Sequence, residues 1–146
     1  MISVPGYKQL ELIQQGPQNL VYTGRCTKDN LPVTLRQLRP ELTTPELVSR
    51  LQREYELLNR IDSEYVIRPI ELINSADSHI LVTEQPSGKH LTELIGSGTL
   101  DIIETASIGC LIAKAIDDLH SYNVVHKDIN PANIVYDAEI RNIKLI

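Results

Sequence analysis

Alternation of apolar and polar residues over the first third of the chain predicts β-structure. Residues 7–13 (YKQLELI), 19–26 (NLVYTGRC) and 32–38 (PVTLRQL) are rich in branched or aromatic side chains, with the turn-forming triplet KDN before the third. Residues 66–73 (VIRPIELI) and 79–84 (HILVTE) predict two more strands, on either side of the turn-like segment NSADS. The pattern therefore predicts five strands in the first 84 residues.

One amphipathic helix interrupts these strands. Thr44 can cap its N-terminus, and Pro45 suits the first helical position. Apolar side chains then recur at intervals of three or four residues, at Leu47, Leu51, Tyr55, Leu58 and Ile61. The pattern predicts a helix with one face buried against the sheet.

After Glu84 the pattern changes from strands to helices. Residues 85–98 (QPSGKHLTELIGSG) predict a connector that leads into one short helix. A longer helix is predicted from Asp101 to His120, where Asp101 and Glu104 have the spacing of a capping box. Its apolar stripe is expected to comprise Ile102, Ala106, Ile112, Ile116 and Leu119.

The last residues return to the strand pattern. Residues 133–136 (NIVY) and 140–146 (IRNIKLI) predict a small β-pair across the turn DAE. The order of elements predicts an α+β chain of two lobes: a β-rich lobe at 1–83, a connection at 84–90 and a helical lobe at 91–146.

Composition narrows the class of protein. The chain has 146 residues, 42% of them apolar, which is long enough for a sizeable core built from Leu, Ile and Val, because Trp and Phe are absent. The net charge of −5 argues against a nucleic-acid-binding surface. Cys26 and Cys110 form no metal or disulfide pattern, and neither a signal peptide nor a membrane-spanning run is present, so we expect a cytoplasmic protein.

The segment 124–136 (VVHKDINPANIVY) carries the candidate chemistry. Asp128 and Asn133 lie five residues apart between two apolar runs. A carboxylate can accept the proton of an attacking hydroxyl group, and a carboxamide oxygen can bind Mg²⁺ without adding negative charge. The alternative is a polar surface turn held by Pro131, but the pattern His-x-Asp-x-x-x-x-Asn, between a helix and an apolar strand, favours a functional loop.

This pattern, HKDINPAN, resembles the catalytic loop of the eukaryotic-type protein kinases. The resemblance implies a bilobal kinase fold, with a five-stranded antiparallel sheet and one helix in the first lobe, and ATP and Mg²⁺ as cofactors. It makes Asp128 the catalytic base-like residue, Asn133 the metal ligand and His126 a packing strut. Kinases that phosphorylate Ser and Thr usually carry lysine where this chain has Asn130, which can hydrogen-bond a phosphate oxygen but supplies no charge.

The glycine-rich strap of that family aligns with residues 14–21 (QQGPQNLV). Gly16 and Val21 keep the family residues, whereas Gln14 and Asn19 replace glycines, and Asn19 could adopt the positive φ of a turn. Pro17 removes one N–H donor. By itself this segment is typical of an ordinary hairpin. We assign it to nucleotide binding because it lies between the first two predicted strands, where the family has its glycine-rich strap.

Arg36 stands where the family has the lysine that clamps the α- and β-phosphates. Arginine keeps the charge and can bind phosphate through two N–H groups, although a solvated strand arginine is the alternative. Glu54 lies on the apolar side of the predicted helix. The resemblance implies an ion pair between Glu54 and Arg36, and the alternative is a pair with Arg50, four residues earlier.

Residues 80–88 (ILVTEQPSG) resemble the hinge between the kinase lobes. The resemblance places Thr83 behind the adenine pocket and the backbone of Glu84 at the adenine edge. Pro86 lacks an N–H group where the family usually offers one, so adenine binding is expected to depend on the Glu84 carbonyl and on apolar packing. The apolar residues expected against the base are Ile13, Val21 and Val135.

Taken together, the resemblance implies a serine/threonine protein kinase that transfers the ATP γ-phosphoryl group to a protein substrate in signal transduction. The opening ISVPGY and the form HKDINPAN are most similar to the kinase domains that begin large bacterial signalling proteins, so further C-terminal signalling domains are expected.

The family places the metal-binding Asp of Asp-Phe-Gly directly after the strand IKLI, where this chain ends. The chain is therefore expected to hold the first half of a kinase domain, with a truncated helical lobe, and to be inactive by itself. Two alternatives stay open: a pseudokinase scaffold, favoured by Arg36, the degraded strap and Pro86, and a small-molecule kinase of the same architecture.

Overall fold

The computed structural model describes residues 3–76 and 78–146. Two units can be distinguished, one formed by Met1–Arg60 with Arg68–Gln85 and the other by Ile61–Ile67 with Pro86–Ile146. In the described residues, no helix has the length and apolar character needed to cross a membrane.

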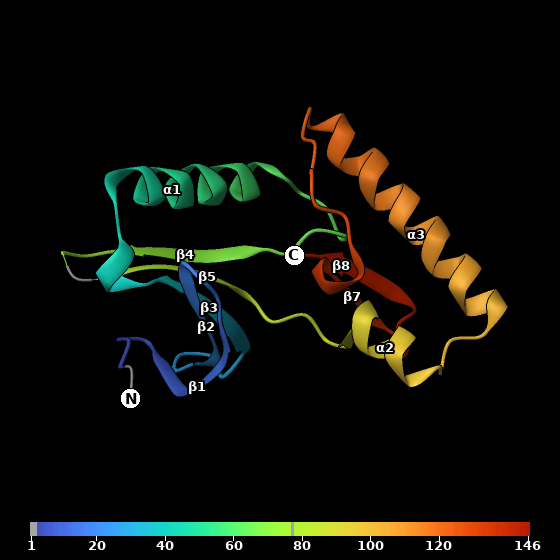
Figure 1. Cartoon of the computed structure of the whole chain (residues 1–146), viewed down its shortest axis with the longest axis horizontal. Helices are drawn as coiled ribbons and strands as arrows, with labels where there is room; N and C mark the ends of the chain where they lie inside the picture. Colours follow the sequence, from blue (N-terminus) through green and yellow to red (C-terminus); the bar gives the residue numbers. More distant parts are fainter. Residues whose placement is uncertain (1–2, 77) are drawn as a thin grey trace. The chain divides into compact units, whose positions relative to one another are not determined.

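The first unit contains a five-stranded antiparallel sheet (Figure 1). Its strands run in the order β1-β2-β3-β5-β4. Their bounds are β1 (Tyr7–Gln15), β2 (Asn19–Cys26), β3 (Pro32–Leu38), β4 (Pro69–Asn74) and β5 (His79–Glu84). The predicted number of strands, their antiparallel pairing and the α+β class are confirmed. The turn predicted after β4 includes residue 77, which lies outside the described residues.

Helix α1 (Pro45–Arg60) follows the short helix η1 (Pro40–Leu42) and lies along one face of this sheet (Figure 1). Thr44 caps it as predicted, because its Oγ1 accepts a hydrogen bond from the Leu47 N–H group at 3.3 Å. The apolar face of α1 packs against side chains of β3, β4 and β5 that lie on this face of the sheet. This cluster comprises Leu38, Leu51 and Leu81, with Leu47, Val48, Tyr55, Leu58 and Leu72 around them.

A second core lies on the other face of the sheet, since successive strand side chains point to opposite sides. It comprises Val4, Val33, Leu35, Ile80 and Val82. Val4 reaches this core through a tight turn, in which Gly6 has a φ of 88° and the Tyr7 N–H group donates to the Val4 carbonyl at 3.1 Å. The Tyr7 hydroxyl donates to Glu71 at 2.7 Å, and burial together with this carboxylate raises the pKa of Tyr7.

The second unit combines two α-helices with a small antiparallel sheet of order β6-β7-β8. Its elements are β6 (Lys89–His90), α2 (Leu91–Ser97), α3 (Ile102–Ser121), η2 (Pro131–Asn133), β7 (Ile134–Asp137) and β8 (Asn142–Leu145). The predicted pair β7–β8 is present, and β6 is an addition that the sequence pattern did not indicate. Gly88, with a φ of 104°, permits β6 to pair with β7, because a Cβ atom there would lie 2.2 Å from the Tyr136 carbonyl oxygen.

Helix α3 begins as predicted, with Asp101 Oδ1 accepting from the Glu104 N–H group at 2.7 Å. The predicted stripe, however, is wrong at its start: Ile102 is 84% exposed and Ala106 is exposed. The buried residues of α3 are Ile108, Ala115 and Leu119. Apolar residues occur on several sides of this helix, so more than one stripe fits the spacing, and only packing decides which one is buried.

Residues 61–67 join the second unit through backbone contacts with β8. The Leu145 N–H group donates to the Tyr65 carbonyl at 2.7 Å, and the Ile67 N–H group donates to the Leu145 carbonyl at 3.0 Å. The Tyr122 hydroxyl, at the end of α3, donates to the Asp62 carbonyl at 3.1 Å. These bonds fix the end of β8, against which the polar loop described next is anchored.

Candidate functional site

The loop between α3 and β7 gathers two amide side chains around Asp128. Each carboxylate oxygen of Asp128 accepts one amide hydrogen bond: Oδ1 from Asn130 Nδ2 and Oδ2 from Asn133 Nδ2, both at 2.8 Å. The Asp128 carbonyl also accepts from the two amides, at 3.3 Å from Asn130 and 3.0 Å from Asn133. The structure therefore brings the three predicted residues of this loop together.

Backbone bonds hold the loop in this form. Asn130 caps η2, with its Oδ1 accepting from the Ala132 N–H group at 2.9 Å, and Pro131 occupies the first turn. The Asn133 N–H group donates to the Asn130 carbonyl, and the Asn133 carbonyl accepts from Ile146, both at 3.0 Å. Lys127 lies directly before Asp128, and its positive φ of 67° turns the backbone into the loop.

His126 supports the same loop from its N-terminal side. Its Nδ1 accepts a hydrogen bond from the Asp128 N–H group at 3.3 Å. The imidazole thus contacts the backbone of Asp128, in the way expected of a strut, and leaves the carboxylate to the two amides.

The chemistry of this loop suits a single Mg²⁺ ion held by few protein ligands. The Asn133 amide nitrogen is engaged by Asp128, whereas in the described part of the chain no hydrogen bond is made to Asn133 Oδ1. Among the described residues, no three His, Cys, Asp or Glu side chains form a metal cluster. The Asn133 amide oxygen fits Mg²⁺, which keeps several waters and takes only one or two protein ligands.

In the first unit, Arg36 of β3 and Glu54 of α1 form an ion pair through Arg36 Nη2 and Glu54 Oε1. Arg36 is therefore the partner of Glu54, and no ion pair of Glu54 with Arg50 occurs in the described residues. The two side chains are 34% and 38% exposed. Glu54 lies at the edge of the apolar face of α1 and is only half-buried.

The strap between β1 and β2 is a closed hairpin turn. The Gly16 N–H group donates to the Asn19 carbonyl at 2.8 Å, and Pro17 has no N–H group. Asn19 belongs to β2 and does not have the positive φ that the alignment allowed. Arg39 Nε donates to the Gly16 carbonyl at 3.0 Å, so the turn is tied to the end of β3.

The N–H groups at the end of β5 are also engaged within the first unit. The Glu84 N–H group donates to the Arg68 carbonyl at 3.0 Å, and the Gln85 N–H group donates to the Pro32 carbonyl at 3.2 Å. Thr83 is buried. Since Pro86 has no N–H group, residues 84–86 offer no free backbone donor.

The predicted site residues divide between the two units. The first unit contains Ile13, Gly16, Val21, Arg36, Glu54, Thr83 and Glu84. The second contains Asp128, Asn130, Asn133 and Val135. Ile13 is 57% exposed on β1, whereas Val135 is buried in β7.

The sequence pattern did not indicate two contacts, one to the polar loop and one to the strap. His90 Nδ1 hydrogen-bonds the Ala132 carbonyl at 2.8 Å, and Arg39 holds the strap. No spacing signal could have revealed the first contact, because the partners are separated by 42 residues and one of them is a backbone carbonyl.

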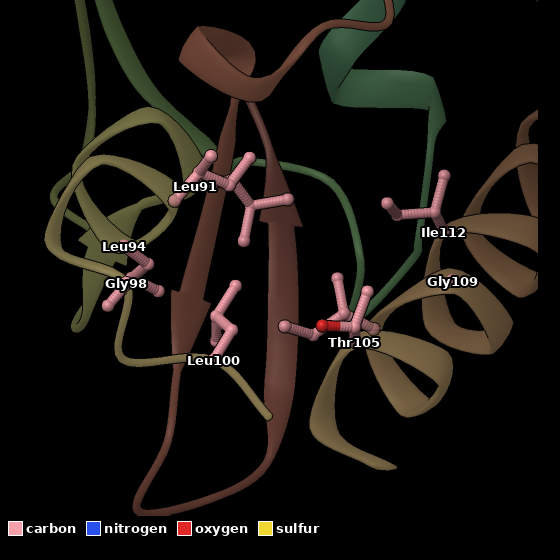
Figure 2. Close-up of a pocket in the computed structure, with 9 residues that line it drawn as sticks. Leu91, Leu94, Gly98, Leu100, Thr105, Gly109 and Ile112 are labelled. Carbon is pink, nitrogen blue, oxygen red and sulfur yellow. The ribbon is translucent and has the colours of Figure 1, made fainter. Parts of the chain in front are cut away.

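The second unit also contains an apolar cavity of about 420 Å³ (Figure 2). Figure 2 shows Leu91 and Leu94 of α2 on one side and Thr105 and Ile112 of α3 on the other. Thr105 supplies a polar side chain to this lining, and its hydroxyl group already donates to the Asp101 carbonyl at 2.7 Å. This lining does not suit a polyphosphate, and none of the predicted site residues belongs to it.

Comparison with known proteins agrees with the geometry of the loop and of the sheet. The model of the protein kinase domain family matches residues 7–146. A "Probable serine/threonine-protein kinase" of Clostridium perfringens is 29% identical over 135 residues, which cover 91% of this chain and 20% of that protein. A serine/threonine-protein kinase of Arabidopsis thaliana is 27% identical over 137 residues, covering 94% of this chain and 10% of that protein.

A third relative, the mitogen-activated protein kinase kinase 7 of Arabidopsis thaliana, is 27% identical over 139 residues, covering 94% of this chain and 44% of that protein. The chain thus spans less than half the length of each of these relatives. The family match extends over both units and over every residue of the polar loop. The chain therefore belongs to the protein kinase domain family.

Proposed function

We propose that this chain is part of a serine/threonine protein kinase, in which Asp128 orients the hydroxyl group of a protein substrate for attack on the γ-phosphorus of ATP. The observation that supports this most directly is the Asp128 carboxylate, exposed at its loop and held by two amides. A carboxylate has about four acceptor positions, so two remain for a hydroxyl group after the amides are counted.

Asn133 is the proposed metal ligand. Its amide nitrogen is fixed on Asp128, which leaves Oδ1 as the atom that would hold Mg²⁺. When bound, the metal neutralises negative charge on the transferred phosphoryl group. The protein's own part is to hold Asp128, which precedes η2, and Asn133, its last residue, together through the Asn133 amide.

The first unit is proposed to bind the nucleotide. Arg36, oriented by Glu54, would contact the phosphates in place of the family's lysine. Since residues 84–86 offer no free N–H group, adenine would be bound through the Glu84 carbonyl, with Thr83 behind it. The proposed apolar and strap contacts of this unit are Ile13, Gly16 and Val21, and Val135 of the second unit is proposed as a further apolar contact.

A pseudokinase scaffold is the second candidate, and the strap favours it. With the Gly16 N–H group donated to Asn19 and Pro17 lacking one, this turn has little to offer a phosphate. Asp128 and Asn133 argue for catalysis instead, because a scaffold needs neither a fixed carboxylate nor an amide oxygen beside it.

The test is transfer of labelled γ-phosphate from ATP by the full-length protein that carries this chain. We expect Mg²⁺-dependent label on protein, recovered as phosphoserine or phosphothreonine after hydrolysis. Binding of ATP without transfer would support the scaffold, and label only on small alcohols such as choline or an aminoglycoside would support a small-molecule kinase. Either result would contradict the proposal.

A further inference from the structure

Asn130 and Asn133 approach Asp128 in the same way but differ at their carbonyl oxygens. Each amide nitrogen has two hydrogens, and each donates to one carboxylate oxygen and to the backbone carbonyl of Asp128. Asn130 Oδ1 accepts from the Ala132 N–H group at 2.9 Å, whereas Asn133 Oδ1 has no hydrogen bond to the described residues. Asn133 therefore has an oxygen left for a ligand, whereas both amide hydrogens of Asn130, which are its only donors for a phosphate, are already in use.

From this difference we infer that Asn130 is a positioning residue for Asp128 and does not contact the phosphate. The inference rests on the proposed function, and it replaces the expectation that Asn130 hydrogen-bonds a phosphate oxygen. An amide hydrogen of Asn130 would have to leave Asp128 before it could bind a phosphate oxygen. A lysine at this position has three hydrogens and could serve a carboxylate and a phosphate at once.

The two amides fix the carboxylate from both sides. With Oδ1 held by residue 130 and Oδ2 by residue 133, rotation of the Asp128 side chain about its last bond would break both 2.8 Å bonds. Loss of Asn130 leaves only one bond, so the carboxylate can turn away from the hydroxyl that it orients. The expected defect lies in the reaction step and not in ATP binding.

The test is Asn130→Ser in the full-length protein, alone and combined with Asp128→Ala. Serine can still cap η2 through the Ala132 N–H group but is too short to reach the carboxylate. We expect kcat to fall by roughly ten- to a hundred-fold with the KM for ATP within about two-fold. In the Asp128→Ala background the same substitution should cause no further loss, because a positioning residue acts only through the group it holds.

Asn142→Ser is the matched control. Asn142 is held at both ends in a similar way, donating to Glu64 at 3.3 Å and accepting from the Ile143 N–H group at 2.9 Å, but outside the loop. Its substitution should leave kcat unchanged. Should Asn130→Ser fail to fold, Asn130→Asp keeps the cap, replaces the donor by a like charge and should lower kcat at least as much.

The outcomes separate the inference from the proposed function. A loss that persists in the Asp128→Ala background, or a raised KM for ATP with unchanged kcat, would overturn the positioning role of Asn130. If Asp128→Ala itself keeps full activity, the proposed function fails. If Asp128→Ala is inactive while Asn130→Ser is fully active, only the positioning role fails.

Discussion

At the residue scale, the two asparagines of the loop show what a one-dimensional pattern can indicate. The spacing of Asp128 and Asn133 predicted that these groups act together, and the structure places them 2.8 Å apart. The sequence did not indicate that Asn130 turns back onto Asp128, because this depends on the cap that it forms on Ala132. A side chain with two polar ends has its direction decided by local backbone geometry.

The ion pair of Arg36 and Glu54 yields a prediction that separates function from stability. Both side chains are about one-third exposed, so the pair contributes at most about 1 kcal/mol to folding. Glu54→Gln should shift the melting temperature little but raise the KM for ATP by roughly ten-fold, because the guanidinium loses the charge that orients it.

The control for this prediction is Glu56→Gln on the same helix, where an exposed glutamate accepts a hydrogen bond from Gln52. Steady-state kinetics at varied ATP should show no change for this variant. Equal KM values for wild type and Glu54→Gln would remove the ion pair from nucleotide binding.

Asp137 predicts a pH effect on stability. A hydrogen bond from Ser87, with backbone N–H groups of Glu139 and Ile140, lowers the pKa of Asp137. A lowered folded-state pKa means that this contribution is present above the unfolded-state value and is lost as pH falls through the folded-state value. Between about pH 5 and pH 3 the wild type should therefore lose melting temperature more steeply than Asp137→Asn.

Thermal melts of the two proteins across that range, followed by circular dichroism, measure the difference. The difference between the two curves should narrow toward the acid end, as the wild-type carboxyl takes up its proton. Parallel curves would show that Asp137 is not stabilised in its charged form.

At the element scale, the sequence predicted the strands and helices that have a regular pattern and missed short elements that have none. Strand β6 is two residues long, so it carries no periodicity, and it forms only because β7 is beside it. In the same way, α3 has apolar residues on several sides, so the sequence pattern alone did not determine which side is buried. The packing of α3 against β8 determines it. A strand that forms, or a helix face that is buried, only because a neighbouring strand is present cannot be predicted from the local sequence pattern.

Gly88 tests whether the pairing of β6 with β7 is required. Gly88→Ala would place a methyl group 2.2 Å from the Tyr136 carbonyl oxygen at a φ of 104°, so the strand must shift or separate. We expect a loss of about 2 kcal/mol or more in the free energy of unfolding. Gly96→Ala, in α2 with open space around it, should instead stabilise by about 0.4–1 kcal/mol.

Chemical denaturation of the two alanine variants gives both values. Similar stabilities for Gly88→Ala and Gly96→Ala would contradict the view that β6 needs a glycine beside Tyr136.

At the scale of the whole molecule, the resemblance to a known family predicted more about function than the order of strands and helices did. The element order alone predicted an α+β chain of two lobes, which many functions could share. The loop HKDINPAN predicted the family, and the match over residues 7–146 confirms it. Departures from the family pattern at residues 36 and 130 could be noticed in the sequence, but their contacts depend on packing that the sequence does not state.

The central claim is that the Asp128 carboxylate takes part in phosphoryl transfer. The most direct measurement is the rate of Mg²⁺-dependent γ-phosphoryl transfer by the full-length protein, compared between Asp128→Ala and Asp117→Ala, an exposed aspartate on α3. We predict that Asp128→Ala lowers the rate by on the order of 10²- to 10⁴-fold and that Asp117→Ala leaves it unchanged. Equal rates for the two variants would contradict the account.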